Sequence, residues 1–185
     1  NGIQLDVTLA NRSFESFKIK QRSLKGTSGC GLCGKTALKD AFPELAVLSW
    51  QQPPPLAQIK QLKPELSQWQ KMAQHSGALH AAFWIDQSNQ IIACREDIGR
   101  HNAVDKLIGY SKRKQMDAAG CSLLVTSRCS VEIVQKAVAC GVSSLVSLAS
   151  PSQLALEFAL KHKLNLIHIP RKDNPVNLTM ELLND

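Results

Sequence analysis

The sequence predicts a single α/β domain with three layers, α/β/α, in which helices cover both faces of a mixed sheet. Two apolar runs around a polar turn at residues 86–89 are typical of a β-hairpin, whose strands pair antiparallel. From residue 100 to residue 169, apolar runs alternate with helical segments, which indicates crossover units. The composition agrees, because 44% of the 185 residues are hydrophobic and 20% are charged.

The first elements are a strand and a helical segment. Apolar and polar residues alternate over residues 3–9, a period of two that predicts a half-buried strand. Three prolines at residues 53–55 mark a linker. Apolar residues then recur at helical spacing over residues 56–73, with Pro64 acceptable as the first residue of a second helical segment. Gly77 is expected to end this region.

The remaining elements alternate between strands and helices. We expect strands at 78–85 and 91–94, a helix with Ala103, Val104, Leu107 and Ile108 on one face, a strand at 122–126, a helix at 131–140 ended by Gly141, a strand at 144–148, a helix at 152–162 and a strand at 164–169.

The bulk properties limit the class of partner. The net charge of +7 favours an acidic partner: the phosphates of a nucleotide-like ligand, a nucleic acid or an acidic protein surface. Aromatic residues are sparse and are not interleaved with a basic stripe, so we expect no nucleic-acid binding. No apolar run approaches the roughly 18 residues that cross a bilayer, and no secretory leader is visible.

Four cysteines lie singly in the sequence, and we expect them to be small buried hydrophobic residues of a protein in the reducing cytoplasm: Cys94, Cys121, Cys129 and Cys140.

Cys30 and Cys33 form a Cys-x-x-Cys pair in a glycine-rich stretch, and thiols at this spacing usually carry chemistry. No second pair of ligands completes a structural zinc site, so we expect no metal bound by side chains. Glycines flank and separate the two cysteines and oppose a stiff helical start. We therefore expect a mobile loop over residues 26–36, which suits a sulfur carrier better than a redox site.

Three further segments are candidates for binding anions. Arg100 and His101 follow Gly99 at the start of a helix, where backbone N–H groups can bind an anion. The alternative is a solvated, salt-bridged helix start with Asp97 as its N-cap. Arg128 lies beside the start of another helix, which Ser130 can cap. The third segment is a basic turn after the final strand: Ile169, Pro170, Arg171, Lys172, Asp173 and Asn174.

These motifs, in their order and spacing, resemble the FdhD family of formate dehydrogenase accessory proteins. The resemblance rests on residues 27–35, 79–82, 95–109 and 126–128, and its most specific part is Glu96-Asp97-Ile98-Gly99-Arg100-His101-Asn102. It covers residues 1 to about 178, and residues 1–185 are expected to be one FdhD-like domain of a longer family chain.

The resemblance implies a cytidine deaminase-like fold and a sulfurtransferase. Family members accept sulfur from a cysteine desulfurase as a persulfide, and they pass it to the bis-molybdopterin guanine dinucleotide cofactor of formate dehydrogenase. Cys30 matches the persulfide cysteine, Cys33 its companion, and residues 169–174 the segment that contacts the cofactor. Lys172 and Asn174 depart from the family pattern there. The resemblance also suggests a homodimer.

Two competing functions are distinguishable. A zinc-dependent deaminase of the same fold needs His-x-Glu, and here His80-Ala81-Ala82 lacks the glutamate. A non-catalytic chaperone that only binds the molybdenum cofactor remains an alternative, and it predicts nucleotide binding without sulfur on the protein.

Overall fold

A computed structural model describes residues 6, 8, 10–11, 14 and 44–184. The chain divides into two units, residues 1–43 and 44–185, and the sheet with its covering helices belongs to the second. The predicted strand at residues 3–9 falls largely outside the described residues. The predicted loop at residues 26–36, with Cys30 and Cys33, lies entirely outside them.

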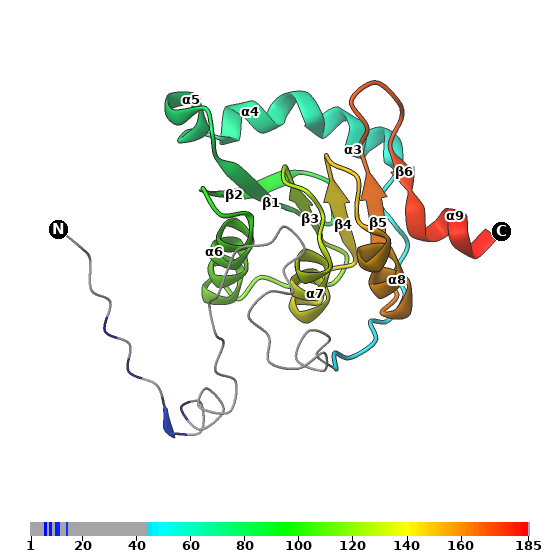
Figure 1. The fold of residues 1–185 in the computed structure, drawn as a ribbon, viewed down its shortest axis with the longest axis horizontal. Helices are drawn as coiled ribbons and strands as arrows, with labels where there is room; N and C mark the ends of the chain where they lie inside the picture. The colour runs from blue at the N-terminus through cyan, green and yellow to red at the C-terminus, as the bar shows by residue number, and fades with distance from the viewer. Residues whose placement is uncertain (1–5, 7, 9, 12–13, 15–43, 185) are drawn as a thin grey trace. The chain divides into compact units, whose positions relative to one another are not determined.

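The second unit is built on a six-stranded mixed sheet with the order β2-β1-β3-β4-β5-β6 (Figure 1). β1 pairs antiparallel with both β2 and β3, β4 pairs parallel with β3 and β5, and β6 pairs antiparallel with β5. The predicted hairpin and the predicted crossovers are therefore both present. The strands are β1 (His80–Ile85), β2 (Ile91–Asp97), β3 (Ser122–Val125), β4 (Ser144–Ser147), β5 (Asn165–His168) and β6 (Val176–Asn177).

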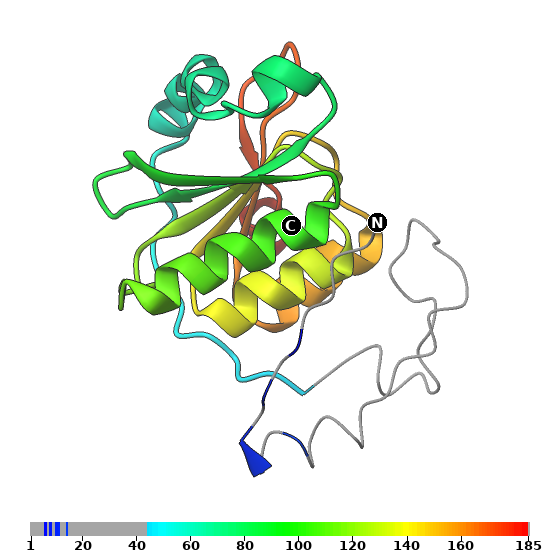
Figure 2. The same cartoon turned by 90° about the vertical axis from the view of Figure 1, so that its left-hand side faces the viewer.

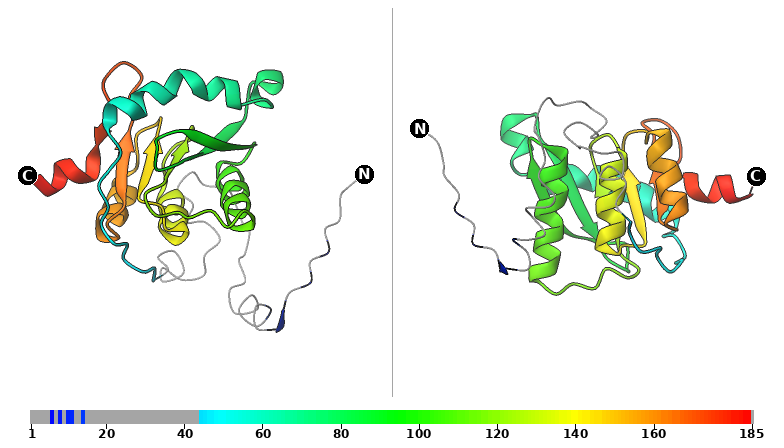
Figure 3. Two further views of the ribbon diagram at one scale, coloured as in Figure 1. Left: turned by 180° about the vertical axis from the view of Figure 1, so that it is seen from behind. Right: turned by 60° about the horizontal axis from the view of Figure 1, so that its bottom comes forward.

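Helices cover both faces of this sheet, which confirms the three-layer prediction (Figure 2). One face carries the three crossover helices side by side (Figure 3): α6 (Arg100–Arg113), α7 (Val131–Cys140) and α8 (Gln153–Lys161). The other face carries a helical segment that precedes the sheet in the chain: α3 (Leu56–Leu62), the 3₁₀ helix η1 (Lys63–Glu65), α4 (Leu66–Trp69) and α5 (Ala73–Ser76). The C-terminal helix α9 (Leu178–Asn184) lies against β5 and α8.

Most element ends follow local sequence signals. Gly77 and Gly141 end α5 and α7 in the left-handed region, with φ of 69° and 85°, where glycine has no steric cost. Pro64 lies in the first turn of η1, where its missing N–H has no intrahelical acceptor to lose.

The structure extends the prediction at two places. β2 runs to Asp97 instead of ending at Cys94, so three charged residues continue an apolar strand. β6 and α9 were not expected from the sequence. β6 has only two residues, and its pairing with β5 defines it as a strand.

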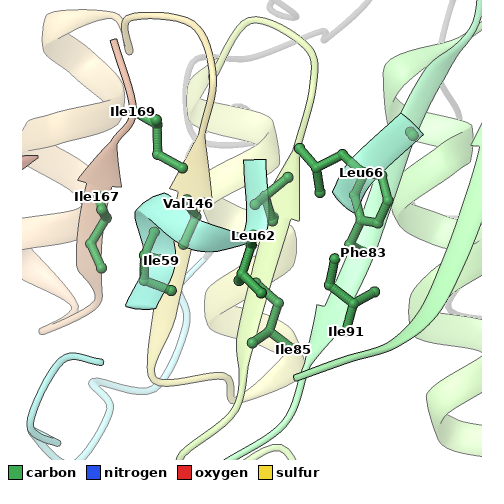
Figure 4. Close-up of a cluster of buried hydrophobic side chains, with 11 residues drawn as sticks. Ile59, Leu62, Leu66, Phe83, Ile85, Ile91, Val146, Ile167 and Ile169 are labelled. Carbon is green, nitrogen blue, oxygen red and sulfur yellow. The ribbon is translucent and has the colours of Figure 1, made fainter. Parts of the chain in front are cut away.

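The helical segment α3–α4 is held to the sheet by an apolar cluster (Figure 4). Ile59, Leu62 and Leu66 point from the helices toward the strands and are 0–4% exposed. Their spacing of three and four residues puts them on one helical face, and alternate strand residues face them. The sheet side of the cluster is Ala81, Phe83, Ile85, Ile91, Leu124, Val146, Ile167 and Ile169.

The strand directions bring several chain segments to one edge of the sheet. β3, β4 and β5 are parallel and end in register at Val125, Ser147 and His168. β2 runs the same way, because β2 and β3 are both antiparallel to β1. We call this edge, where β2, β3, β4 and β5 end, the carboxyl edge. Ligands of open α/β sheets bind at such edges.

Candidate functional site

All three predicted anion-binding segments that the structure describes lie at the carboxyl edge. Arg100 and His101 begin α6 directly after β2, and Arg128 lies in the turn between β3 and α7. Residues 169–175 connect β5 to β6 and are called the β5–β6 loop below. The predicted persulfide residues Cys30 and Cys33 are outside the described residues, so the structure does not place them relative to this edge.

A carboxylate organises the turn that leads into α6. Asp97 Oδ1 accepts hydrogen bonds from the Gly99 N–H (2.8 Å) and from Asn102 Nδ2 (3.1 Å), and Lys106 Nζ lies 2.5 Å from Asp97 Oδ2. The hydrogen bond from Lys106, followed by that from Gly99, lowers the pKa of Asp97 to about 2. The N-cap of α6 is Gly99, so the alternative in which Asp97 is the N-cap is wrong. Asp97 fixes the turn by holding Gly99 instead.

Glu96, the residue before Asp97 in β2, binds the start of α5. Its side chain is on the opposite face of β2 from Asp97, as neighbouring strand residues are, and the residue is 8% exposed. The N–H groups of Met72 and Ala73 donate to Glu96 Oε2 (2.9 Å) and Oε1 (2.8 Å). One buried carboxylate therefore satisfies two N–H groups at the start of α5, which have no acceptor within the helix.

His101 lies against α7, with 31% of its side chain exposed. Its Nε2 lies 2.8 Å from Glu132 Oε2, although the carboxylate is off the direction of the ring N–H, so the contact is mainly electrostatic. A second pair, Lys136 Nζ with Asp105 Oδ1 at 2.6 Å, also joins α6 to α7. Burial lowers the pKa of His101 and the charge of Glu132 opposes that shift. The observed contact of His101 is therefore with Glu132 of α7, which indicates a role in packing α6 on α7 and not in binding an anion.

The turn between β3 and α7 presents a cation at the carboxyl edge. Arg128 is exposed, and its side chain has no hydrogen-bond partner among the described residues. Ser127 is buried and donates to the Arg128 carbonyl oxygen (3.2 Å). Ser130 occupies the N-cap position of α7, as predicted, but its hydroxyl accepts no bond from the helix. By contrast, Ser152 Oγ caps α8 by accepting from the Ala155 N–H at 3.2 Å.

The β5–β6 loop is held by two lysines that no sequence motif marks. Lys63 Nζ donates to the carbonyl oxygens of Pro170 (3.0 Å) and Arg171 (3.2 Å). Lys60 Nζ donates to Asn174 Oδ1 at 2.7 Å. The two lysines are three residues apart, which marks one side of a helix, but their partners are more than 100 residues away. No sequence pattern reports such a contact.

The predicted binding residues form two groups and not one cluster. Arg100, His101 and Arg128 belong to the layer of α6 and α7. The β5–β6 loop is tied to α3 and η1, on the other face of the sheet. β2 and β5 are four strand spacings apart, roughly 19 Å. A small anion can therefore bind one group or the other, whereas an elongated dinucleotide has the length to reach both.

The described cysteines are poor candidates for carrying sulfur. Cys121, Cys129 and Cys140 are buried, and Cys94 is half-buried and packs against the apolar cluster. Burial raises the pKa of all four thiols, for Cys94 and Cys129 to about 12. Because the thiolate is the reactive form, these positions disfavour nucleophilic attack.

Within residues 44–184 no group of three or more His, Cys, Asp or Glu side chains is arranged to hold a metal ion. None of the helices described there is long and apolar enough to span a bilayer.

Comparisons with known proteins agree on one family. The model of the FdhD/NarQ family matches residues 2–180. The chain is 35% identical over 181 residues to the sulfur carrier protein FdhD of Acinetobacter baylyi, covering 95% of this chain and 64% of that protein. It is 33% identical over 171 residues to the sulfur carrier protein FdhD of Bordetella petrii, covering 92% and 62%. The chain thus spans less than two thirds of the length of these relatives.

A solved structure shows the same fold. The crystal structure of a protein described as a formate dehydrogenase accessory protein, from Desulfotalea psychrophila, superposes with a TM-score of 0.64 at 25% identity. The match covers 73% of this chain and 57% of that one.

Proposed function

Because the chain belongs to the FdhD/NarQ family, we propose that it is a sulfur carrier that serves formate dehydrogenase, with Cys30 as the residue that carries sulfur. The observation that carries this proposal is that the family match runs through the Cys30–Cys33 pair, and that its relatives are named as sulfur carriers. The raised pKa of the other four thiols, three of them buried and Cys94 half-buried, supports the choice of this pair.

Loading of sulfur is a thiol exchange with a cysteine desulfurase as donor. The thiolate of Cys30 attacks the terminal sulfur of the donor's cysteine persulfide. A new S–S bond forms on Cys30, the donor's S–S bond breaks, and the donor cysteine leaves as a thiolate. Nothing is oxidised or reduced overall. The glycine-rich surroundings of Cys30 suit an exchange that needs access for a second protein.

Delivery needs two electrons if the sulfur leaves as sulfide, and Cys33 supplies them. The thiolate of Cys33 attacks Cys30 Sγ, a Cys30–Cys33 disulfide forms, and hydrosulfide leaves for the acceptor. The spacing of the two cysteines permits this ring. A reducing pool then restores both thiols before the next cycle.

The acceptor is an anionic guanine dinucleotide molybdenum cofactor, bound as substrate at the carboxyl edge. Arg171 and Lys172 are exposed on the β5–β6 loop, and Arg128 is exposed beside α7. These side chains, with Arg100, supply positive charge to phosphate groups. Their spread over two groups fits a ligand with more than one nucleotide unit.

Intact-mass measurement after incubation with a cysteine desulfurase and cysteine tests the proposal. The wild-type chain is expected to gain the mass of one sulfur atom, and Cys30→Ala to gain none. Cys94→Ala is the matched control, because it removes a half-buried thiol with a raised pKa, and it should gain sulfur normally. Full labelling of Cys30→Ala would refute the assignment. Guanine nucleotide binding with no sulfur on the wild type would favour the non-catalytic cofactor chaperone instead.

A further inference from the structure

Lys63 makes two contacts that fix the backbone of the β5–β6 loop. Its ammonium group, at the start of η1, donates to two consecutive carbonyl oxygens, those of Pro170 (3.0 Å) and Arg171 (3.2 Å). An ammonium group has three donors and no acceptor, so both carbonyls must point toward it. The side chain is half-buried, which strengthens these charge-assisted bonds relative to exposed ones.

This arrangement decides where the loop's N–H groups point. In a trans peptide the N–H lies opposite to the C=O of the same plane. Since the carbonyls of residues 170 and 171 face Lys63, the N–H groups of Arg171 and Lys172 face away from it together. Neither N–H has an acceptor within the described part of the chain. Two neighbouring donors on one side of a loop are an arrangement suited to an anion.

The charges around the loop favour the same kind of ligand. Arg171 and Lys172 are exposed, and Lys60 reaches the far end of the loop at Asn174 Oδ1. Asp173 is the single acidic residue between 169 and 175. Buried Ile169 and Pro175 flank the loop, and the contacts of the two lysines are with residues 170, 171 and 174 between them.

We propose that Lys63 is a positioning residue, which orients the peptide planes of residues 170–172 so that their N–H groups bind a diphosphate group. This inference rests on the proposed function, because it takes the β5–β6 loop as the segment that binds the guanine nucleotide part of the acceptor. Lys63 itself faces the carbonyl side of the loop and does not touch the phosphate. Lys60 secures the end of the loop through Asn174.

Calorimetric titration of the full chain with GDP and with guanosine separates the phosphate contribution from that of the base. Wild type is expected to bind GDP more tightly than guanosine. Lys63→Met should weaken GDP binding by about tenfold, the cost of misplacing two donors, and leave guanosine binding unchanged. Lys63→Arg keeps a cation with several donors and should recover most of the affinity. Lys161→Met, which removes an exposed lysine at the end of α8, is the charge-matched control and should bind as wild type.

Hydrogen exchange distinguishes positioning from a direct charge effect. In wild type, saturating GDP should slow the exchange of the amides of Arg171 and Lys172. In Lys63→Met at saturating GDP this protection should be lost, whereas in Lys161→Met it should remain. Weaker GDP binding with the two amides still protected at saturating GDP would overturn the inference, because the lysine would then act on the phosphate by charge alone. Equal GDP affinity in wild type and Lys63→Met would overturn it while leaving the proposed function intact. If wild type binds GDP no better than guanosine, both the inference and the assignment of this loop to the cofactor fail.

Discussion

Replacing Glu96 by Gln tests whether the most specific motif of the chain is structural or chemical. In wild type the carboxylate accepts two N–H groups, from Met72 at 2.9 Å and from Ala73 at 2.8 Å, in a site that is 8% exposed. A glutamine has one acceptor oxygen, so one N–H loses its partner and meets an NH₂ group instead. A hydrogen bond to a charged group contributes about 1.5–3 kcal/mol, and the free energy of unfolding should fall by about that amount.

Urea denaturation followed by circular dichroism measures this change, with Glu65→Gln as the control. Glu65 is exposed on η1, and its substitution should change the stability by less than about 0.5 kcal/mol. Because the hydrogen bonds of the Glu96 carboxylate within residues 44–184 go to backbone N–H groups at the start of α5, sulfur loading of Cys30 by the desulfurase should remain at the wild-type level. A Glu96→Gln variant with wild-type stability but no sulfur loading would refute the structural role and assign this carboxylate to the chemistry.

Two further predictions follow from the packing of the helices on the sheet. Ile59→Ala removes a side chain that is 0% exposed between α3 and the sheet, and should lower the free energy of unfolding by about 2–4 kcal/mol in urea denaturation. Ile92→Ala, at a position that is 41% exposed, should cost less than about 1 kcal/mol, and equal losses would contradict the observed packing. The lowered pKa of His101 predicts a pH dependence: the unfolded chain protonates this residue first, so stability is lost as pH falls below about 6.5 and through the lower pKa of the folded state. In urea denaturation at several pH values, the free energy of unfolding of His101→Gln should fall less at low pH than that of wild type. The same pH profile for both proteins would contradict this role of His101.

The elements that the sequence predicts well are those whose signals are local. Helix α7 has the predicted bounds, because apolar periodicity defines its body and Gly141 defines its end. The last three residues of β2 were not predicted, because Arg95, Glu96 and Asp97 lack an apolar pattern. Arg95 is kept in the strand by its position over the ring of Tyr110 (4.1 Å) and Glu96 by its contacts with α5. Both are tertiary contacts, which local propensity does not contain.

The candidate site shows the same limit more strongly. The sequence located the β5–β6 loop from its charge and its place after the last parallel strand. It did not locate Lys63, because a lysine on an amphipathic helix is usually a solvated residue, and only the fold brings it to the carbonyls of residues 170 and 171. Likewise, the sequence proposed His101 as an anion ligand. The fold gives it a carboxylate neighbour, Glu132, from the next crossover unit.

The block from Glu96 to Lys106 joins more elements of the fold than any local cap would. Glu96 holds the start of α5 on one face of the sheet, while on the other face Asp97 holds the turn into α6 and His101 contacts α7. Lys106 closes the arrangement by donating to the Glu96 carbonyl oxygen (3.1 Å) and pairing with Asp97. Each of these side chains therefore contacts a different part of the fold. Arg100 is the first residue of α6, so the contacts that stabilise this turn also place its backbone at the carboxyl edge.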